Sequence, residues 1–120
     1  MESNNKKILV VDDEKTIRDF FKRLLSLSNV EVAEAEDGYT AIKLARENKF
    51  NIFFVDMRMP GLDGLETSRR IHQINPEAAI TIITGYAMSE AVKQAQEEGY
   101  RIISKPFDIK DIEDVIKNAK

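Results

Sequence analysis

The chain has no cysteine, a single histidine and no apolar run long enough to cross a bilayer. Without cysteine, neither a disulfide framework nor a zinc site built on thiolates can form. A membrane-spanning helix needs about 20 apolar residues, so we expect no membrane contact. An excess of one charge is also missing, because 18 basic and 21 acidic residues give a net charge of −3. Nucleic-acid binders normally carry a basic stripe, so we expect no direct contact with nucleic acid.

The 120 residues suit one domain with one hydrophobic core. We therefore expect a single domain over residues 1–120, with an ordered core at about 6–118. The polar start, residues 1–5, lacks the apolar stretch of a secretory signal peptide. A cytoplasmic location is the resulting expectation.

Two hydrophobic periodicities alternate along the chain. Short β-branched and apolar runs predict strands buried on both faces, and apolar residues at helical spacing predict helices between them. Strands are expected at 8–11, 30–35, 52–55, 79–84 and 102–103, with 30–35 nearest an edge. Helices are expected around 17–25, from Asp37 to near Lys49, up to about Asn75, from Ala87 to Gly99, and over 109–119. This order predicts an α/β fold, a doubly wound five-stranded parallel sheet with five helices on its two faces.

Acidic residues directly follow two of the expected strands. Asp12 and Asp13 follow the first strand, and Asp56 follows the third. Open parallel sheets bind ligands at the carboxyl ends of their strands, so these carboxylates are expected to meet. At ~4 Å and an effective dielectric of ~20, each pair of charges repels by about 4 kcal/mol. The cluster therefore needs a cation or a proton. The cation that suits a few carboxylates, water and a phosphate oxygen is Mg²⁺, with Mn²⁺ as a substitute.

Two further residues complete this set. Thr84 closes the fourth expected strand and Lys105 closes the fifth. Each residue type has a use in phosphoryl transfer to a carboxylate. One aspartate acts as the nucleophile, two others hold the metal, and the lysine and the hydroxyl contact phosphoryl oxygens.

Four segments together resemble one family, the receiver domain of two-component response regulators, and in particular its chemotaxis-regulator-like single-domain members. They are Ile8–Glu14 (ILVVDDE), Val55–Gly64 (VDMRMPGLDG), Ile83–Tyr86 (ITGY) and Ser104–Phe107 (SKPF). They occur in the family's order and spacing, and the resemblance covers essentially the whole chain. It implies a flavodoxin-like fold with strand order 2-1-3-4-5.

The resemblance also implies roles at the acidic cluster. Asp56 matches the phosphoacceptor. Asp13 matches the carboxylate that binds Mg²⁺ directly, and Asp12 the one that acts through water. The backbone carbonyl of Arg58 matches the third protein ligand of the metal.

Further implied roles concern switching. Thr84 matches the switch hydroxyl, Gly85 the small residue beside the phosphate, and Lys105 the lysine that pairs with the phosphoryl group. The bond between Lys105 and Pro106 matches one that is usually cis. Tyr86, together with Arg58, flanks the path of attacking water and is expected to tune loss of the phosphoryl group.

The sequence departs from the family pattern at Ile102, where most receivers have tyrosine or phenylalanine. The segment between Gly99 and Lys105 is also about one residue shorter than usual. Tyr100 is a candidate substitute. The alternative is that phosphorylation shifts Thr84 and the fourth expected helix by another route.

The resemblance implies a phosphorylation-activated signalling switch and not an enzyme, apart from self-catalysed phosphorylation and slow autodephosphorylation. Its expected partners are a sensor histidine kinase and either a downstream target protein or a histidine phosphotransferase. A phosphorelay intermediate and a receiver fragment of a larger regulator are the alternatives. A receiver that binds without phosphorylation is a less favoured one, because every site residue is present.

Two other function classes fit less well. A haloacid-dehalogenase-like phosphatase needs a second acid two residues after its aspartate, where this chain has Arg58. A flavodoxin-like electron carrier needs a Ser/Thr/Gly-rich loop after the first strand, where this chain has Asp12, Asp13 and Glu14.

Other chemistry-bearing residues have simpler interpretations. Asp37 and Asp63 are expected at turns or helix caps, and His72 on the surface. Phe107 is expected beneath the last helix. The core is expected to include the aromatic residues Phe20, Phe21, Phe50, Phe53 and Phe54.

Overall fold

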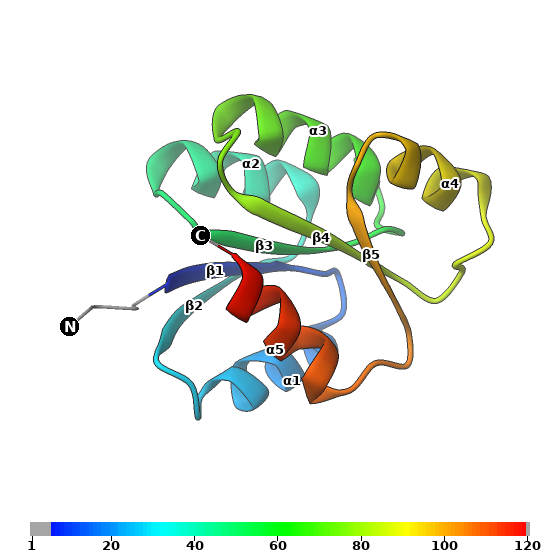
Figure 1. Ribbon diagram of the computed structural model, residues 1–120. Helices are drawn as coiled ribbons and strands as arrows, with labels where there is room; N and C mark the ends of the chain where they lie inside the picture. The colour runs from blue at the N-terminus through cyan, green and yellow to red at the C-terminus, as the bar shows by residue number, and fades with distance from the viewer. Residues whose placement is uncertain (1–5, 120) are drawn as a thin grey trace.

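The computed structural model describes residues 6–119, which form one parallel sheet between two layers of helices (Figure 1). The first five residues and residue 120, which the expected domain includes, lie outside this range. The strands are β1 (Lys6–Val11), β2 (Val30–Ala35), β3 (Ile52–Asp56), β4 (Ala79–Thr84) and β5 (Arg101–Ser104). The helices are α1 (Lys15–Leu25), α2 (Gly38–Glu47), α3 (Gly64–Ile74), α4 (Glu90–Glu97) and α5 (Ile109–Asn118).

The sheet has the order β2-β1-β3-β4-β5, with every neighbouring pair parallel. This confirms the predicted α/β class, the strand order and the edge position of β2. Helices α1 and α5 cover one face of the sheet, and α2, α3 and α4 lie on the other (Figure 1). The carboxyl ends of β1 and β3 are therefore adjacent, as a site at that edge requires.

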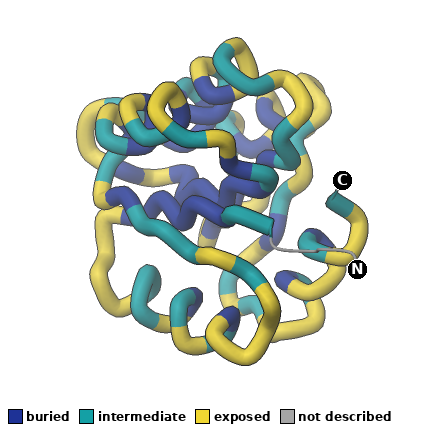
Figure 2. Tube along the Cα trace, turned by 90° about the vertical axis from the view of Figure 1, so that its left-hand side faces the viewer, coloured by how far each residue is buried: buried dark blue, intermediate teal, exposed yellow. Residues whose placement is uncertain are grey.

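The central strands are buried on both faces because apolar residues alternate between two helix layers. In β1, Leu9 and Val11 pack with the layer of α2 and α3, whereas Ile8 and Val10 pack with α1 and α5. Figure 2 shows the central strands in dark blue and the outer helix turns in yellow. Helices therefore cover both faces of the sheet.

Side-chain caps mark the starts of α2 and α3. The side chains of Asp37 and Asp63 accept hydrogen bonds from the backbone N–H groups of Thr40 and Glu66, as capping residues do. Helix α2 ends at Glu47, two residues before the predicted end. Both predicted caps are confirmed.

The predicted start of α4 is wrong. Ala87 and Met88 precede the helix, which begins at Glu90, and Met88 is 82% exposed. The Ser89 hydroxyl accepts a hydrogen bond from the N–H of Val92 at 3.2 Å. This cap fixes the helix start because serine oxygen satisfies a donor that has no partner within the helix.

One predicted core residue is also wrong. Phe20 is 42% exposed, whereas its neighbour Phe21 is 1% exposed. Adjacent helical residues point about 100° apart, so only one of them faces the sheet. The ring of Phe107 packs against both, with its centroid 5.9 Å from that of Phe20 and 5.4 Å from that of Phe21. As expected, Phe107 also packs against the apolar cluster that includes Ile112 and Val115 of α5. The other predicted core aromatics, Phe50, Phe53 and Phe54, are buried.

Helix α4 lies on its own small apolar cluster. It contributes only short side chains, Ala91, Val92 and Ala95, to this cluster. They pack with Met57 after β3, Leu65 of α3 and Ile82 of β4. At its end, the Arg69 guanidinium of α3 forms two hydrogen bonds with the Glu98 carboxylate. These bonds, with one from Gln94, lower the pKa of Glu98 to about 2.

Two remaining predictions concern the surface. His72 on α3 is exposed, as predicted. Within residues 6–119, none of the helices combines the length and apolar character that spanning a membrane would take.

Candidate functional site

Three carboxylates meet at the carboxyl edge of the sheet. Asp12 and Asp13 follow β1, and Asp56 is the last residue of β3. One oxygen from each carboxylate lies within 4.8 Å of the others. Asp12 and Asp56 are 3% and 8% exposed, and Asp13 is exposed. The structure therefore brings together the acidic residues that the sequence predicted.

Burial disfavours the charged form of the two buried acids. Burial raises the pKa of Asp12 to about 6, and repulsion from Asp56 adds to this. A hydrogen bond from the Glu14 N–H to Asp12 Oδ1, at 2.9 Å, and the charge of Lys105 act in the opposite direction. Burial also raises the pKa of Asp56, although Lys105 partly offsets it. Such desolvated carboxylates gain free energy when a cation binds.

Lys105 reaches this cluster from the end of β5. Its Nζ atom lies 3.2 Å from Asp56 Oδ1, to which it donates, and 3.9 Å from Asp12 Oδ2. Burial disfavours the charged amine, but the Asp56 carboxylate outweighs this effect and the net pKa of Lys105 is raised. The charged Lys105 ammonium group therefore partly neutralises the carboxylates of Asp56 and Asp12.

The Thr84 side chain lies at the end of β4 and is 1% exposed. Its Oγ1 atom accepts a hydrogen bond from the Tyr86 N–H at 2.9 Å. Next to it, Gly85 leaves open space, since a Cβ at this position would meet no atom within 4 Å. The threonine hydroxyl is thus placed at the wall of the cleft, beside a position that no side chain fills.

Arg58 and Tyr86 stand at the mouth of this cleft. The Arg58 guanidinium lies 4.5 Å from the centroid of the Tyr86 ring, a cation–π distance, and both side chains are exposed. The cleft measures about 340 Å³. It is lined by Asp13, Glu14, Asp56, Arg58, Thr84, Gly85, Tyr86 and Lys105.

The switch candidates Ile102 and Tyr100 lie away from the cleft. The peptide bond between Lys105 and Pro106 is cis, as predicted. Ile102 and Tyr100 are half-buried and pack on the cluster beneath α4. Neither residue lines the cleft.

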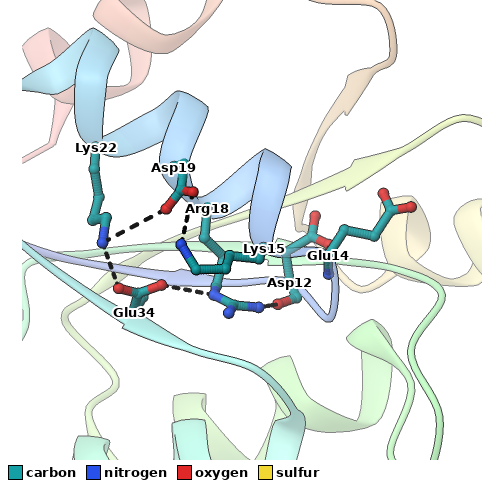
Figure 3. Close-up of polar contacts among 7 residues, drawn as sticks. All are labelled: Asp12, Glu14, Lys15, Arg18, Asp19, Lys22 and Glu34. Atoms are coloured by element: carbon teal, nitrogen blue, oxygen red, sulfur yellow. Dashed lines mark hydrogen bonds and ion pairs between the residues drawn. The ribbon is translucent and has the colours of Figure 1, made fainter.

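Three residues near the site were missed from the sequence. Glu14 lines the cleft, and Arg18 of α1 bonds to both the Asp12 backbone and Glu34 of β2 (Figure 3). The acidic run that continues through Glu14 is a sequence signal for the first. No signal marks Arg18 and Glu34, because their contact depends on how β2 pairs with β1.

The fold and the cleft define an α/β domain of the flavodoxin-like class with an acidic site at the carboxyl edge. The family model described as "Response regulator receiver domain" matches residues 8–117. The chain belongs to the response regulator receiver domain family.

Individual relatives agree with this assignment. Sporulation initiation phosphotransferase F of Bacillus subtilis (strain 168) is 30% identical over 114 residues, covering 94% of this chain and 92% of that protein. A receiver domain structure from Clostridium thermocellum has a TM-score of 0.87 and 34% identity, and the match covers 94% and 92% of the two chains. A response regulator structure from Burkholderia pseudomallei, with a phosphorylated aspartic acid, calcium ion and citrate, has a TM-score of 0.86 and 28% identity, covering 95% and 68%. The chain spans only 46% to 47% of several other curated relatives.

Membership of the family carries general properties. Receiver domains are phosphorylation-dependent switches of two-component systems, and they work with histidine kinases and phosphotransfer proteins. They are signalling switches and generally not true enzymes. They bind Mg²⁺ at an acidic aspartate cluster. Asp12, Asp13 and Asp56 fit this ion, because hard carboxylate oxygens converge and two of them are desolvated.

The lysine charge should oppose metal binding at this cluster. We expect Lys105→Met to tighten Mg²⁺ binding by about tenfold, because the ion no longer shares the carboxylates with an ammonium group. Isothermal titration calorimetry at constant ionic strength measures this change. Lys117→Met, which removes the same charge from the last turn of α5, should leave the affinity unchanged. Equal or weaker binding in Lys105→Met would contradict the expectation.

Proposed function

We propose that this chain is a phosphorylation-controlled switch in which Asp56 accepts a phosphoryl group in the presence of Mg²⁺. One observation carries the proposal. The Asp56 carboxylate lies in an open cleft beside two other carboxylates, one hydroxyl and one ammonium group. A nucleophile, a metal-binding set and donors for phosphoryl oxygens are therefore within one small site.

The donor is a phosphohistidine of a sensor kinase or a small phosphodonor. An Asp56 oxygen attacks phosphorus, the bond from phosphorus to the donor breaks, and an acyl phosphate forms on Asp56. Asp13, the Arg58 carbonyl and Asp12, the last of these through water, would hold the metal. When bound there, the ion would supply charge neutralisation for the phosphoryl oxygens and the carboxylates.

Phosphorylation then changes the hydrogen bonding of the switch residues. The Thr84 hydroxyl now accepts from the Tyr86 N–H, and it is free to donate to a phosphoryl oxygen. Lys105, now paired with Asp56, pairs with the phosphoryl group. These rearrangements favour a second position of the loop after β4 and of α4, which alters the surface that a partner contacts. Ile102 and Tyr100 take part through the cluster beneath α4.

The side chains at the mouth set the lifetime of the acyl phosphate. Arg58 and Tyr86 stack over the opening of the cleft, so they limit the approach of water to phosphorus. Gly85 leaves space next to the phosphoryl group. We assign to these three residues a tuning role.

The domain in this proposal covers residues 1–120, and its output is contact with a target protein. The Bacillus subtilis relative is named a phosphotransferase and is matched over 92% of its length. That match favours a relay intermediate, which passes the group to a histidine phosphotransferase, as the second candidate. Other relatives are about twice as long as the matched region. They favour the third candidate, a receiver that is part of a larger regulator.

Intact-mass spectrometry tests the central step. Incubation with phosphoramidate or acetyl phosphate and Mg²⁺ should yield one phosphoryl adduct per chain, and a chelator should prevent it. Asp56→Asn should give none, because an amide oxygen is a poor nucleophile at phosphorus. Asp114→Asn on α5 is the matched control, with the same change of charge away from the cleft, and should be phosphorylated like the wild type.

Either of two results would refute phosphorylation at this site. One is an adduct that persists in Asp56→Asn. The other is no adduct in the wild type together with no effect of beryllofluoride on the amide NMR signals of the cleft residues. An effect of beryllofluoride without a trapped adduct indicates rapid turnover at an intact site.

A further inference from the structure

Arg18 connects helix α1 to the backbone of the acidic loop. Its Nη1 atom donates to the carbonyl oxygen of Asp12 at 2.8 Å, and its Nε atom donates to Glu34 Oε1 at 2.7 Å (Figure 3). The Arg18 side chain is only 12% exposed. A largely buried guanidinium that bridges two acceptors holds both in a fixed geometry, because its donors form a rigid fork.

The bond to Asp12 acts on one particular peptide group. The Asp12 carbonyl belongs to the peptide that joins Asp12 to Asp13, so the guanidinium fixes the plane between the two acidic residues. The rest of Asp12 is held as well, by the bond from its N–H to the Ala35 carbonyl at 3.1 Å and by the Glu14 bond at its carboxylate. Within residues 6–119, Arg18 is the only side chain that bonds to this peptide plane.

Glu34 holds the guanidinium in place from β2. It lies opposite Val10 in the parallel register, and its second oxygen accepts from Lys22 Nζ at 2.5 Å. Hydrogen bonds from Lys22 and Arg18 lower the pKa of Glu34, so its carboxylate stays charged in the range where a metal would bind. The orientation of the Arg18 side chain is therefore set by its hydrogen bond to Glu34 on β2.

We propose that Arg18 is a positioning residue of the acidic metal site, acting through the peptide plane between Asp12 and Asp13. The inference rests on the proposed function, since it assumes that these carboxylates hold Mg²⁺. It assigns to Glu34 the role of holding Arg18. Neither residue touches the metal or the phosphoryl group.

Charge and position predict opposite effects for this residue. Arg18 is a positive charge near a cation site, so its removal by charge alone would tighten Mg²⁺ binding. Loss of the fixed peptide plane would weaken binding, because the carboxylates would have to be ordered when the ion binds. Outer-shell partners of metal ligands typically change affinity by about 10-fold to 100-fold.

The test compares Mg²⁺ affinities of four proteins at constant ionic strength, followed by amide NMR shifts in magnesium titrations. Arg18→Met should weaken binding about tenfold. Arg18→Lys keeps the charge but cannot bridge Asp12 and Glu34 with a planar fork, so it should weaken binding as well. Lys22→Met is the matched control, because it removes the same charge from the other partner of Glu34 and does not contact Asp12. It should bind like the wild type or slightly tighter.

A second readout uses the metal-free protein. The amide groups of Asp13 and Glu14 should exchange faster with solvent in Arg18→Met than in Lys22→Met, since only the first frees the peptide plane. A merely structural role would lower the melting temperature of Arg18→Met without changing Mg²⁺ affinity well below that temperature. Unchanged or tighter binding in Arg18→Met would overturn the inference and leave the proposed function intact. Absence of Mg²⁺ binding in the wild type would refute the metal site itself and the inference with it.

Discussion

Asp12→Asn is expected to stabilise the metal-free protein by about 2 to 3 kcal/mol at neutral pH. Asp12 is 3% exposed, and burial raises its pKa from 3.8 to about 6. The ionised carboxylate therefore costs free energy in the folded state that an amide does not. Asparagine keeps the side-chain oxygen that accepts the Glu14 N–H. Urea unfolding followed by circular dichroism, in the presence of a chelator, measures the gain.

The gain should depend on pH in a defined direction. Asp12 binds a proton more tightly when folded, with a pKa of about 6, than when unfolded, with the ordinary value of 3.8. The ionisation cost is fully present above the folded pKa and disappears as the pH falls towards the unfolded one. The difference between variant and wild type should thus shrink to about 0.5 kcal/mol at pH 4 and to near zero at about pH 3.

Two comparisons make this expectation strict. Asp114→Asn on α5, an exposed position, should change the stability by no more than about 0.5 kcal/mol at any pH. Added Mg²⁺ should stabilise the wild type by mass action and should stabilise Asp12→Asn less. A variant that is less stable than the wild type at neutral pH without metal would show that Asp12 carries no ionisation cost.

Gly64→Ala is expected to destabilise the protein by about 3 kcal/mol, the upper end of ordinary overpacking. A Cβ at Gly64 would lie 2.4 Å from the backbone oxygen of Asp56 and 2.6 Å from the Cα atom of Met57. Gly64 is the first residue of α3, and its N–H donates to the Met57 carbonyl at 2.8 Å. The added methyl group would therefore push α3 away from the end of β3, where Asp56 enters the cleft.

The expected loss of stability in Gly64→Ala is opposite in sign to the usual effect of replacing a helical glycine with alanine. Alanine at an unhindered helix position stabilises, by about 1 kcal/mol. Gly85→Ala is the natural control, because its Cβ would meet no atom within 4 Å and its backbone is not left-handed. It should leave the urea midpoint nearly unchanged. If Gly64→Ala proved as stable as the wild type, α3 would not rest on the β3 backbone as closely as the structure has it.

The fold could be predicted from the sequence because each strand carries its own signal. Residues 8–11 of β1 and 52–55 of β3 are continuous apolar runs, as strands buried on both faces require. The boundaries of α4 could not be predicted in the same way. Ala87 and Met88 have the apolar spacing of a helix. The cap at Ser89 nevertheless makes the helix begin at Glu90, so both residues lie outside it. Phe20 was misplaced because periodicity does not decide which of two adjacent aromatics faces the sheet.

The positions of the site residues could also be predicted, because parallel strands place their ends at one edge. Asp12, Asp56, Thr84 and Lys105 follow directly from that rule. The bond from Arg18 to the Asp12 carbonyl could not be predicted, since it depends on the packing angle of α1. Its partner Glu34 depends in addition on the register of β2. Contacts to backbone atoms have no signature in side-chain patterns.

The small side chains that α4 contributes to its interface also bear on how easily this helix can move. Helix α1 is anchored by Phe21 and Leu25, both 1% exposed, and large interlocked side chains move only when their neighbours change rotamer. Helix α4 rests on Ala91, Val92 and Ala95, which form a shallow contact. A small sliding motion keeps such a contact covered, as in shear movements of packed helices. We therefore expect the mechanical compliance of the domain to be concentrated in α4, while α1 and the sheet form a stiffer frame.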